Sequence, residues 1–322
     1  MEILLFWLGR IGDFVVASPV FEALKRRYPG ARLTLVSWPG ACPLAELDPH
    51  LREVWKIHPW SAFWRNLPLL WMLITRRFHL AADLNPSYSR SSAFLTALCR
   101  ARQKISFKKK LSSLLCSESV DFDAEKDHMM RRYAALCRRL GAEFEFRQRV
   151  YLRRRHEAAA ESVLSAGALA PDGIRVAVHP GNFKKYDNRW PERKFVELTR
   201  RLLDIPKVQV FYLAGPGEEA QVLAMLQELP PAVRFLPPMP LAVTAALLKK
   251  MRLFIGHPTS TMHLACAVGT PTLTLISRYN YHCWRPLEPG HHWAVSEQWD
   301  SCRDIPVDAA WMKLREALSV AG

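Results

Sequence analysis

The sequence lacks a hydrophobic run long enough to cross a membrane. The best candidate, Leu67–Thr75, is far shorter than the ~20 residues that a spanning helix needs, and Arg76 and Arg77 follow it directly. Low-complexity tracts are also missing. With 49% hydrophobic and 23% charged residues among 322, the composition is that of an ordinary globular protein. We therefore expect a soluble or peripheral protein, and its length favours two domains.

Metal-binding cysteine motifs are also missing. The seven cysteines form no Cys-x-x-Cys pair and have no His/Cys spacing typical of ligands, which argues against a structural zinc site. We interpret them as reduced, buried thiols in a reducing compartment. One Asp-x-Asp occurs, Asp121-Phe122-Asp123, and such a pair can hold a metal. Because it lies inside an acidic stretch, we interpret it as a solvated loop and predict neither a metal nor a cofactor.

Acidic residues are scarce relative to basic ones. The chain has 45 Lys and Arg against 30 Asp and Glu, a formal net charge of +15. Such a balance predicts an anionic partner: nucleic acid, an anionic membrane surface or a phosphorylated substrate. No recognisable nucleic-acid-binding motif occurs, so we do not expect nucleic acid to be the partner.

Apolar runs typical of buried strands alternate with segments of helical spacing through both halves of the chain. The predicted strands are Ile3–Leu8, Arg32–Ser37, Arg77–Leu84, Ile174–His179, Val208–Ala214, Met251–Ile255 and Thr272–Ile276; the predicted helices include Phe14–Tyr28, Lys194–Leu203, Glu218–Leu229, Leu241–Lys250 and Val307–Val320. This alternation predicts an α/β protein with two doubly wound, Rossmann-like domains, residues 1–160 and 161–322. Ligands of such domains bind at the carboxyl ends of the strands.

The most informative motif is Gly256-His257-Pro258-Thr259-Ser260-Thr261-Met262-His263. It follows a short apolar strand and opens a helix of small residues. A helix N-terminus presents unpaired N–H groups and partial positive charge, which suits a phosphate. The alternative interpretation is an ordinary N-cap with spare hydroxyls.

Five motifs in one order resemble glycosyltransferase family nine, the ADP-heptose:lipopolysaccharide heptosyltransferases. They are Leu8-Gly9-Arg10-Ile11-Gly12-Asp13, His179-Pro180-Gly181, Arg189-Trp190-Pro191-Glu192, Gly215-Pro216-Gly217-Glu218 and Met262-His263-Leu264-Ala265. The resemblance implies a GT-B architecture, with an active cleft between an N-terminal acceptor domain and a C-terminal nucleotide-sugar domain. It implies metal-independent, inverting transfer from an ADP-sugar to a phosphorylated lipopolysaccharide core. It also implies a cytoplasmic protein at the inner face of the inner membrane, in peripheral contact with anionic lipid.

The resemblance assigns roles to particular residues. Asp13 is the implied general base; the alternative for it is a helix N-cap, since Asp is also favoured there. The implied donor-binding residues are Thr259, Ser260, Thr261, Met262, His263, Gly181, Lys184, Lys185 and one of Glu218 and Glu219, the Glu for the ribose hydroxyls. For His263, Lys184, Lys185 and both glutamates, purely structural or solvated roles stay open.

Basic and aromatic residues of the first domain complete the predicted site. Arg10, Arg65 and Arg90 are the implied acceptor-binding residues. Tryptophans between Trp55 and Trp71 could rest at a membrane interface. The alternative is that some tryptophans are core and that basic runs such as Lys108–Lys110 are solvated.

The chain departs from the family pattern at two places. Where the family has Asp before Ser/Thr-Gly, this chain has Pro258-Thr259-Ser260, and where the family often has Lys before Arg/His-Trp-Pro it has Asn188. These departures leave two alternatives open: a transferase for a different nucleotide sugar, and a catalytically silent GT-B binding module. The charge alone motivates a third, a nucleic-acid-binding protein.

Overall fold

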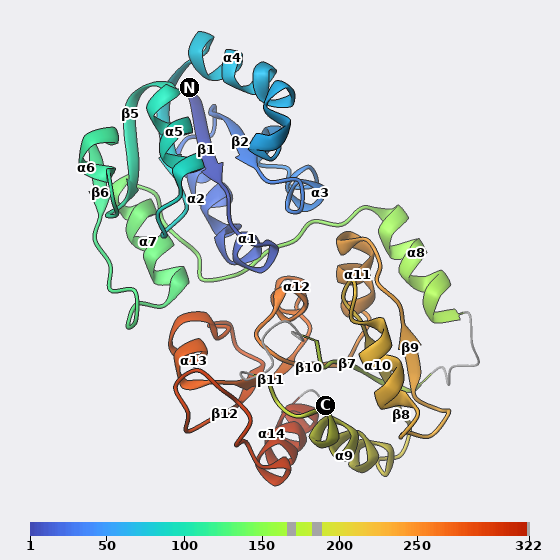
Figure 1. Cartoon of the computed structure of the whole chain (residues 1–322). Helices are drawn as coiled ribbons and strands as arrows, with labels where there is room; N and C mark the ends of the chain where they lie inside the picture. Colours follow the sequence, from blue (N-terminus) through green and yellow to red (C-terminus); the bar gives the residue numbers. More distant parts are fainter. Residues whose placement is uncertain (166–171, 182–188, 321–322) are drawn as a thin grey trace. The chain divides into compact units, whose positions relative to one another are not determined.

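The computed structural model describes residues 1–165, 172–181 and 189–320 (Figure 1). Lys184, Lys185 and Asn188 lie outside the described residues. The chain divides into two compact units, Met1–Tyr151 and Leu152–Gly322. The boundary lies before residue 160, where the sequence predicted it. The reason is that helix α8 (Arg154–Ser165) packs against α11 (Leu241–Leu248) and so belongs to the second unit.

The first unit holds a parallel sheet of six strands, with the order β3-β2-β1-β4-β5-β6 in the part of the chain that the structure describes. Its strands are β1 (Glu2–Trp7), β2 (Arg32–Ser37), β3 (Leu51–Lys56), β4 (Arg77–Asp83), β5 (Arg100–Phe107) and β6 (Glu118–Val120). Its helices are α1 (Ile11–Ala17), α2 (Pro19–Arg27), α3 (Cys42–Ala45), η1 (Trp60–Asn66, a 3-10 helix), α4 (Leu67–Thr75), α5 (Arg90–Leu98), α6 (Ser112–Leu115) and α7 (Met129–Arg139).

The second unit repeats this plan with the order β12-β11-β10-β7-β8-β9, again parallel throughout. Its strands are β7 (Ile174–His179), β8 (Val208–Leu213), β9 (Arg234–Leu236), β10 (Leu253–Gly256), β11 (Thr272–Ile276) and β12 (His291–Val295). Besides α8 and α11 its helices are α9 (Glu192–Leu203), α10 (Glu219–Leu226), α12 (Ser260–Ala267), α13 (Arg278–Trp284) and α14 (Val307–Val320). Counted from each unit's first strand, both sheets have the Rossmann order 3-2-1-4-5-6, which confirms the predicted α/β class.

Helices cover both faces of the first sheet because its central strands are apolar on both sides. Leu4 and Phe6 of β1 belong to one buried cluster with Leu73 of α4, whereas the neighbouring Trp7 meets Tyr133 of α7 edge to face at 6.3 Å. Successive strand residues point to opposite faces, so β1 is covered by α4 on one side and by α7 on the other (Figure 1).

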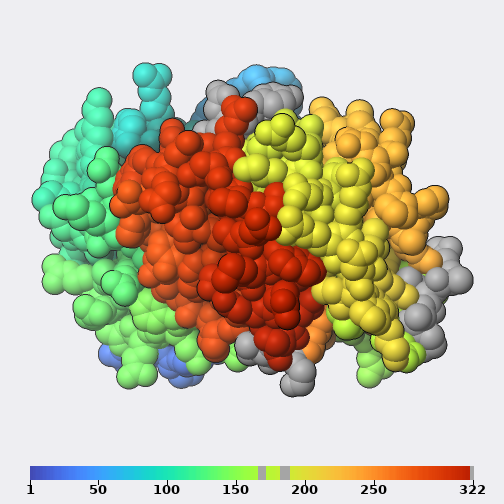
Figure 2. Space-filling view, turned by 90° about the horizontal axis from the view of Figure 1, so that it is seen from below, coloured from blue at the N-terminus to red at the C-terminus, as the bar shows by residue number. Residues whose placement is uncertain are grey.

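The C-terminal helix closes the second unit. α14 packs against α9, and Figure 2 shows the red atoms of the chain's last segment directly beside the yellow atoms of α9. The buried Ala310 and Leu314 of α14 join the same core cluster as Leu198 and Leu202 of α9. The predicted bounds of this helix, Val307–Val320, are confirmed.

The predicted helix Phe14–Tyr28 is wrong in two respects. Helix α1 begins at Ile11, so Gly12 and Asp13 are helical and do not belong to the turn after β1. The helical run is also divided at Ser18, because Pro19 at the first position of α2 has no backbone N–H to continue the hydrogen-bond ladder.

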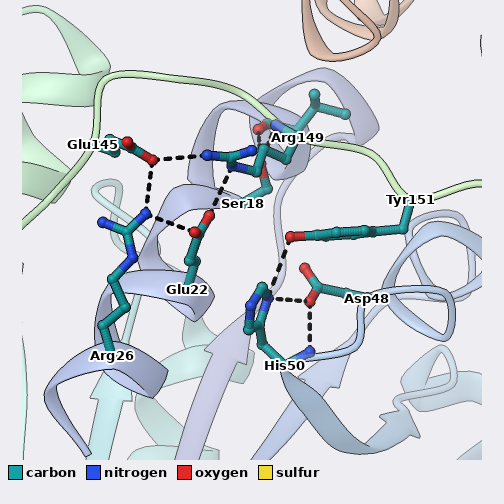
Figure 3. A network of polar contacts seen from close by, with 9 residues as sticks. Ser18, Glu22, Arg26, Asp48, His50, Glu145, Arg149 and Tyr151 are labelled. Atoms are coloured by element: carbon teal, nitrogen blue, oxygen red, sulfur yellow. Dashed lines mark hydrogen bonds and ion pairs between the residues drawn. The ribbon is translucent and has the colours of Figure 1, made fainter.

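The last residues of the first unit are fixed to it by charged contacts (Figure 3). Nε of Arg149 lies 2.7 Å from Glu22 of α2, and Nη2 of Arg149 donates to Glu145 at 2.8 Å. Arg26 bridges the same two carboxylates at 2.6 and 2.9 Å, and the backbone N–H of Arg149 donates to Oγ of Ser18. The segment after α7 is therefore held along α2.

Tyr151, the last residue of this segment, takes part in a second group of polar contacts (Figure 3). Its hydroxyl lies 3.4 Å from Nδ1 of His50, which lies 2.8 Å from the buried carboxylate of Asp48. Burial raises the pKa of the Tyr151 phenol to about 12.

Candidate active site

The second sheet reverses its strand order between β7 and β10, and the loops after these two strands carry the predicted donor motifs. The strands pair directly, with Gly256 opposite His179. A Cβ at Gly256 would lie 2.7 Å from the backbone oxygen of His179, so only glycine lets the two strand ends approach this closely. The carboxyl end of such a switch point is where open α/β sheets bind ligands.

A cavity of about 270 Å³ opens at this point. Its polar wall is formed by the side chains or backbone of His179, Gly215, Glu218, Thr259, Ser260 and Thr261. Its apolar wall is formed by Leu213, Ala214, Pro216, Pro237, Pro238, Met239, Leu241 and Leu264, together with Thr244. A mostly apolar hollow with a few convergent polar groups suits a small ligand with a polar end.

Thr259, Ser260 and Thr261 form the start of helix α12 and are half-buried. Thr259 occupies the N-cap position with φ −115° and ψ 177°, but its side chain does not cap the helix. Its Oγ1 is buried and has no hydrogen-bond partner among the described residues. The first N–H groups of a helix have no partner within it and carry partial positive charge. The helix start can therefore hold an anion, with the Thr259 hydroxyl as a further donor.

The side chains of Glu218 and His179 contact each other in the polar wall of the cavity. Oε2 of Glu218 lies 3.3 Å from Nε2 of His179 and accepts from the N–H of Gly215 at 2.9 Å. A Cβ at Gly181 would come within 2.6 Å of the His179 ring and would also meet Oε2 of Glu218. Gly181 thus contributes to the site by leaving room. Nδ1 of His179 is buried without a partner among the described residues.

The structure separates the two glutamates that the sequence left equal. Glu218 precedes α10 and lines the cavity, whereas Glu219 is the first helical residue and is not among the described residues that line it. Met262 and His263 are also not brought to the wall. Both are buried within α12, where His263 meets Trp284 edge to face at 6.2 Å.

His257 is a buried residue that sequence reasoning did not single out. Its Nε2 accepts from the backbone N–H of Trp190 at 3.3 Å, and burial, reinforced by the nearby His179, lowers its pKa to about 3. The indole of Trp190 donates to the carbonyl of Ile305 at 2.8 Å. The Arg189-Trp190-Pro191-Glu192 motif therefore fixes the loop that carries Thr259, through a neutral histidine.

The first sheet reverses its order between β1 and β4, and Asp13 lies close to this point. It is the half-buried third residue of α1, whose N-cap is Arg10, so the N-cap interpretation of Asp13 is wrong. Burial, and then the charge of Asp13, raise the pKa of the Tyr133 phenol well above its usual value. Asp13 is a carboxylate in the first turn of the helix that follows β1, near the strand end where a ligand-facing group of this fold is expected.

A buried ion pair at the end of β4 was missed by sequence reasoning. Nζ of Lys109 lies 2.7 Å from Asp83, and these side chains are only 10% and 3% exposed. Asp83 also accepts from Asn85 and Ser92, and Oδ1 of Asn85 accepts from the N–H of Leu8 after β1 at 2.7 Å. The interpretation of Lys109 as a solvated residue is wrong, because its ammonium group is bonded to Asp83 and to the carbonyl of Asn85. Asn85 in turn links the loop after β4 to the loop after β1.

The three predicted acceptor-binding arginines are all exposed. Arg10 follows β1, Arg65 lies in η1 after β3, and Arg90 begins α5 after β4. Because the carboxyl ends of parallel strands share one edge, the three residues follow strand ends at the same edge of the first sheet.

Asp121-Phe122-Asp123 has the environment that the sequence predicted. Asp121 is exposed and pairs with Lys108 at 2.8 Å, and Asp123 accepts from the N–H of Glu125 at 2.9 Å. Within residues 1–165, 172–181 and 189–320, no group of three His, Cys, Asp or Glu side chains is arranged to hold a metal ion.

In the same residues, no helix has the length and apolar character needed to span a bilayer.

Comparisons with known proteins identify the family. Residues 72–306 match the model of glycosyltransferase family 9 (heptosyltransferase). The chain is 23% identical over 296 residues to lipopolysaccharide heptosyltransferase 3 of Escherichia coli K12, covering 85% of this chain and 82% of that protein.

Solved structures agree on the fold. A family 9 glycosyl transferase of Veillonella parvula superimposes with a TM-score of 0.88 at 15% identity, covering 99% of this chain and 97% of that one. The ADP-heptose LPS heptosyltransferase II of E. coli superimposes with a TM-score of 0.81 at 18% identity, covering 99% of both chains. The GT-B fold is thereby confirmed, and since the family match covers well over half of the sequence, the chain belongs to glycosyltransferase family 9, the heptosyltransferase family, and is a glycosyltransferase.

Proposed function

We propose that this glycosyltransferase moves a heptose-like sugar from an ADP-sugar to a lipopolysaccharide core acceptor, with inversion at the anomeric carbon. The relative in E. coli is named for lipopolysaccharide heptosyl transfer, and one structural neighbour is named for ADP-heptose. The observation that carries the proposal in this chain is the cavity at the β7–β10 switch point, which is lined by the first residues of α12 and by Thr259, whose buried hydroxyl has no hydrogen-bond partner among the described residues.

The donor diphosphate would lie against the start of α12. Backbone N–H groups at Ser260 and Thr261, with the hydroxyls of Thr259 and Ser260, would meet its oxygens. The same donors would stabilise the negative charge that builds on the departing diphosphate, which is where preorganised dipoles have their largest effect on the rate. Glu218, beside the apolar wall, would accept hydrogen bonds from the ribose hydroxyls.

Asp13 would act as the general base. Its carboxylate would take the proton of the acceptor hydroxyl as the acceptor oxygen forms a bond to the anomeric carbon. The bond from that carbon to the donor phosphate oxygen breaks, and ADP leaves with the electron pair. The acceptor oxygen thus attacks from the face opposite the leaving group, which inverts the centre. Arg10, Arg65 and Arg90, which follow strand ends of the first sheet, would meet anionic groups of the acceptor.

A second candidate is a transferase for a different nucleotide sugar. It is favoured by Pro258, which stands between β10 and α12 where the family carries a carboxylate that helps to hold the donor sugar. Proline has neither a carboxylate nor a backbone N–H, so recognition of the sugar itself must differ here.

Transfer assays with a panel of donors test the proposal. The purified chain is incubated with a deacylated lipopolysaccharide core acceptor and either ADP-heptose or other nucleotide sugars, with and without EDTA. We expect ADP-heptose to give product in both conditions. Product with another donor only would establish the second candidate. Donor binding without turnover across the panel would show a silent binding module and contradict both.

A further inference from the structure

Helix α4 is apolar on both of its sides. Leu69, Leu70, Met72 and Leu73 are buried against the first sheet and its neighbouring helices. The opposite side carries Leu67, Trp71 and Ile74, which are 52%, 70% and 47% exposed. Residues four and seven positions apart share one face of a helix. A surface helix that is apolar all round needs a cover on its outer face.

Neighbouring rings extend this outer face. Trp60 of η1 stacks on Phe63 at 6.1 Å and meets Phe94 of α5 edge to face at 5.5 Å. Trp64 is 67% exposed and stands three residues before Leu67. We call the exposed residues Trp60, Phe63, Trp64, Leu67, Trp71, Ile74 and Phe94 the aromatic face. An exposed apolar patch of this kind marks an interaction site, whereas single scattered residues do not.

A cluster of arginines borders the end of α4. The helix leads through Arg76 into β4, where Arg77 pairs in register with Arg100 of β5. Arg77, Arg100 and Arg102, with His79, line a cavity of about 460 Å³ at the amino ends of the two strands. Nη1 of Arg100 reaches the carbonyl of Ile74 at 3.5 Å, which joins this basic cluster to α4.

The basic cluster lacks counter-charges in the described part of the chain. Arg77, Arg100 and Arg102 are exposed, and none has a carboxylate of a described residue within 4.0 Å. The nearby Glu53 is already paired with Arg76 at 2.9 Å. The cluster lies at the amino end of β4, whereas the Asp83–Lys109 pair lies at its carboxyl end, so the cluster is separate from the candidate active site.

We infer that the aromatic face and the basic cluster together form a docking surface for an anionic lipid bilayer. Tryptophan is the side chain that settles at the boundary between head groups and acyl chains. Arginines beside it are attracted to phosphate head groups of anionic lipids. The surface shows both features side by side, an apolar face to enter the boundary and an unneutralised positive cluster to meet the phosphates. The inference is independent of the sugar or acceptor used.

Vesicle sedimentation tests this surface without donor or acceptor. The full chain is mixed with vesicles of phosphatidylcholine alone or with phosphatidylglycerol added, at low and high salt. We expect binding to the anionic vesicles that weakens with salt. Trp71→Glu should abolish it, whereas Met312→Glu, at a residue of α14 that is 64% exposed, should leave it unchanged. Arg102→Gln should weaken it about fivefold, whereas Arg138→Gln on α7 should not.

Two results would overturn the inference. One is vesicle binding that is absent, indifferent to lipid charge or unaffected by Trp71→Glu. The other is a dimer in sedimentation velocity that Trp71→Glu dissociates, which would assign the face to a second copy of the chain. Because Trp71 is mostly exposed, its variant should keep the melting temperature of the wild type and its transfer to a deacylated acceptor in solution. Failure of transfer in the wild type would contradict the proposed function and leave the vesicle result standing.

Discussion

The carboxylate of Glu218 lies 3.3 Å from Nε2 of His179, and the two side chains meet where the loops after β7 and β8 border one cavity. We predict that Glu218→Gln weakens ADP binding roughly tenfold, since a hydrogen bond to a charged group contributes about 1.5–3 kcal/mol. Titration calorimetry with ADP measures this change. The adjacent Glu219→Gln is the matched control and should bind as the wild type does. Equal effects of the two substitutions would remove Glu218 from the donor site.

Asp13 offers a test that separates chemistry from binding. We predict that Asp13→Asn lowers kcat by about 10²–10⁴-fold, the usual contribution of a positioned base, because the amide cannot take up the acceptor proton. The dissociation constant of ADP should not change, since Asp13 lies in the first unit and the predicted nucleotide site in the second. Asp121→Asn, at an exposed carboxylate, is the control. A variant that keeps most of the wild-type rate would exclude Asp13 as the base.

The buried pair of Asp83 and Lys109 predicts a non-additive stability effect. Removing one partner leaves an uncompensated buried charge, so Asp83→Asn and Lys109→Met should each lower the free energy of unfolding by about 3–5 kcal/mol. The double variant should lose less than the sum of the two. Urea unfolding of the wild type, the two single variants and the double variant gives the double-mutant cycle. Additive losses would show that the 2.7 Å contact does not couple the two residues energetically.

His257 predicts that stability falls in mild acid. Its pKa is about 3 in the folded chain, against about 6.5 when unfolded. Below pH 6.5 the His257 imidazole is protonated in the unfolded chain but stays neutral in the folded chain. The contribution of this residue is therefore fully present above roughly pH 6.5 and is lost as pH falls towards 3, with about 1 kcal/mol gone one pH unit below 6.5.

Urea unfolding at two pH values checks this slope. The loss of stability between about pH 7.5 and 5.5 should be smaller in His257→Gln than in the wild type. In His282→Gln, which replaces an exposed histidine, the loss of stability between the two pH values should equal that of the wild type. His291, whose pKa burial lowers to about 4, adds a loss of the same sign in all three proteins. Identical slopes in the wild type and His257→Gln would contradict the account of a neutral, buried His257.

Parallel strands were the most predictable part of the fold. Arg32–Ser37, Ile174–His179 and Thr272–Ile276 begin and end as the sequence indicates, because strands buried on both faces are nearly continuous apolar runs. The start of α1 was missed because Gly9 and Gly12 resemble a turn. Gly12 is instead a buried residue of that helix.

The site was predictable only where local sequence decides the geometry. The hydroxyl-rich start of α12 lies after its strand as predicted, because strand, turn and helix are adjacent in the chain. The choice between Glu218 and Glu219 depends on contacts with His179, and the burial of Lys109 depends on Asp83, which lies 26 residues away. No spacing rule reveals such pairs, since they arise only when distant strand ends meet.

The most direct test of the central claim is a crystal structure of the chain with ADP bound. The account predicts the diphosphate against the N–H groups of Ser260 and Thr261, within hydrogen-bond distance of the Thr259 hydroxyl, with the ribose beside Glu218. Density for the nucleotide elsewhere, with the start of α12 in contact with no phosphate oxygen, would contradict it.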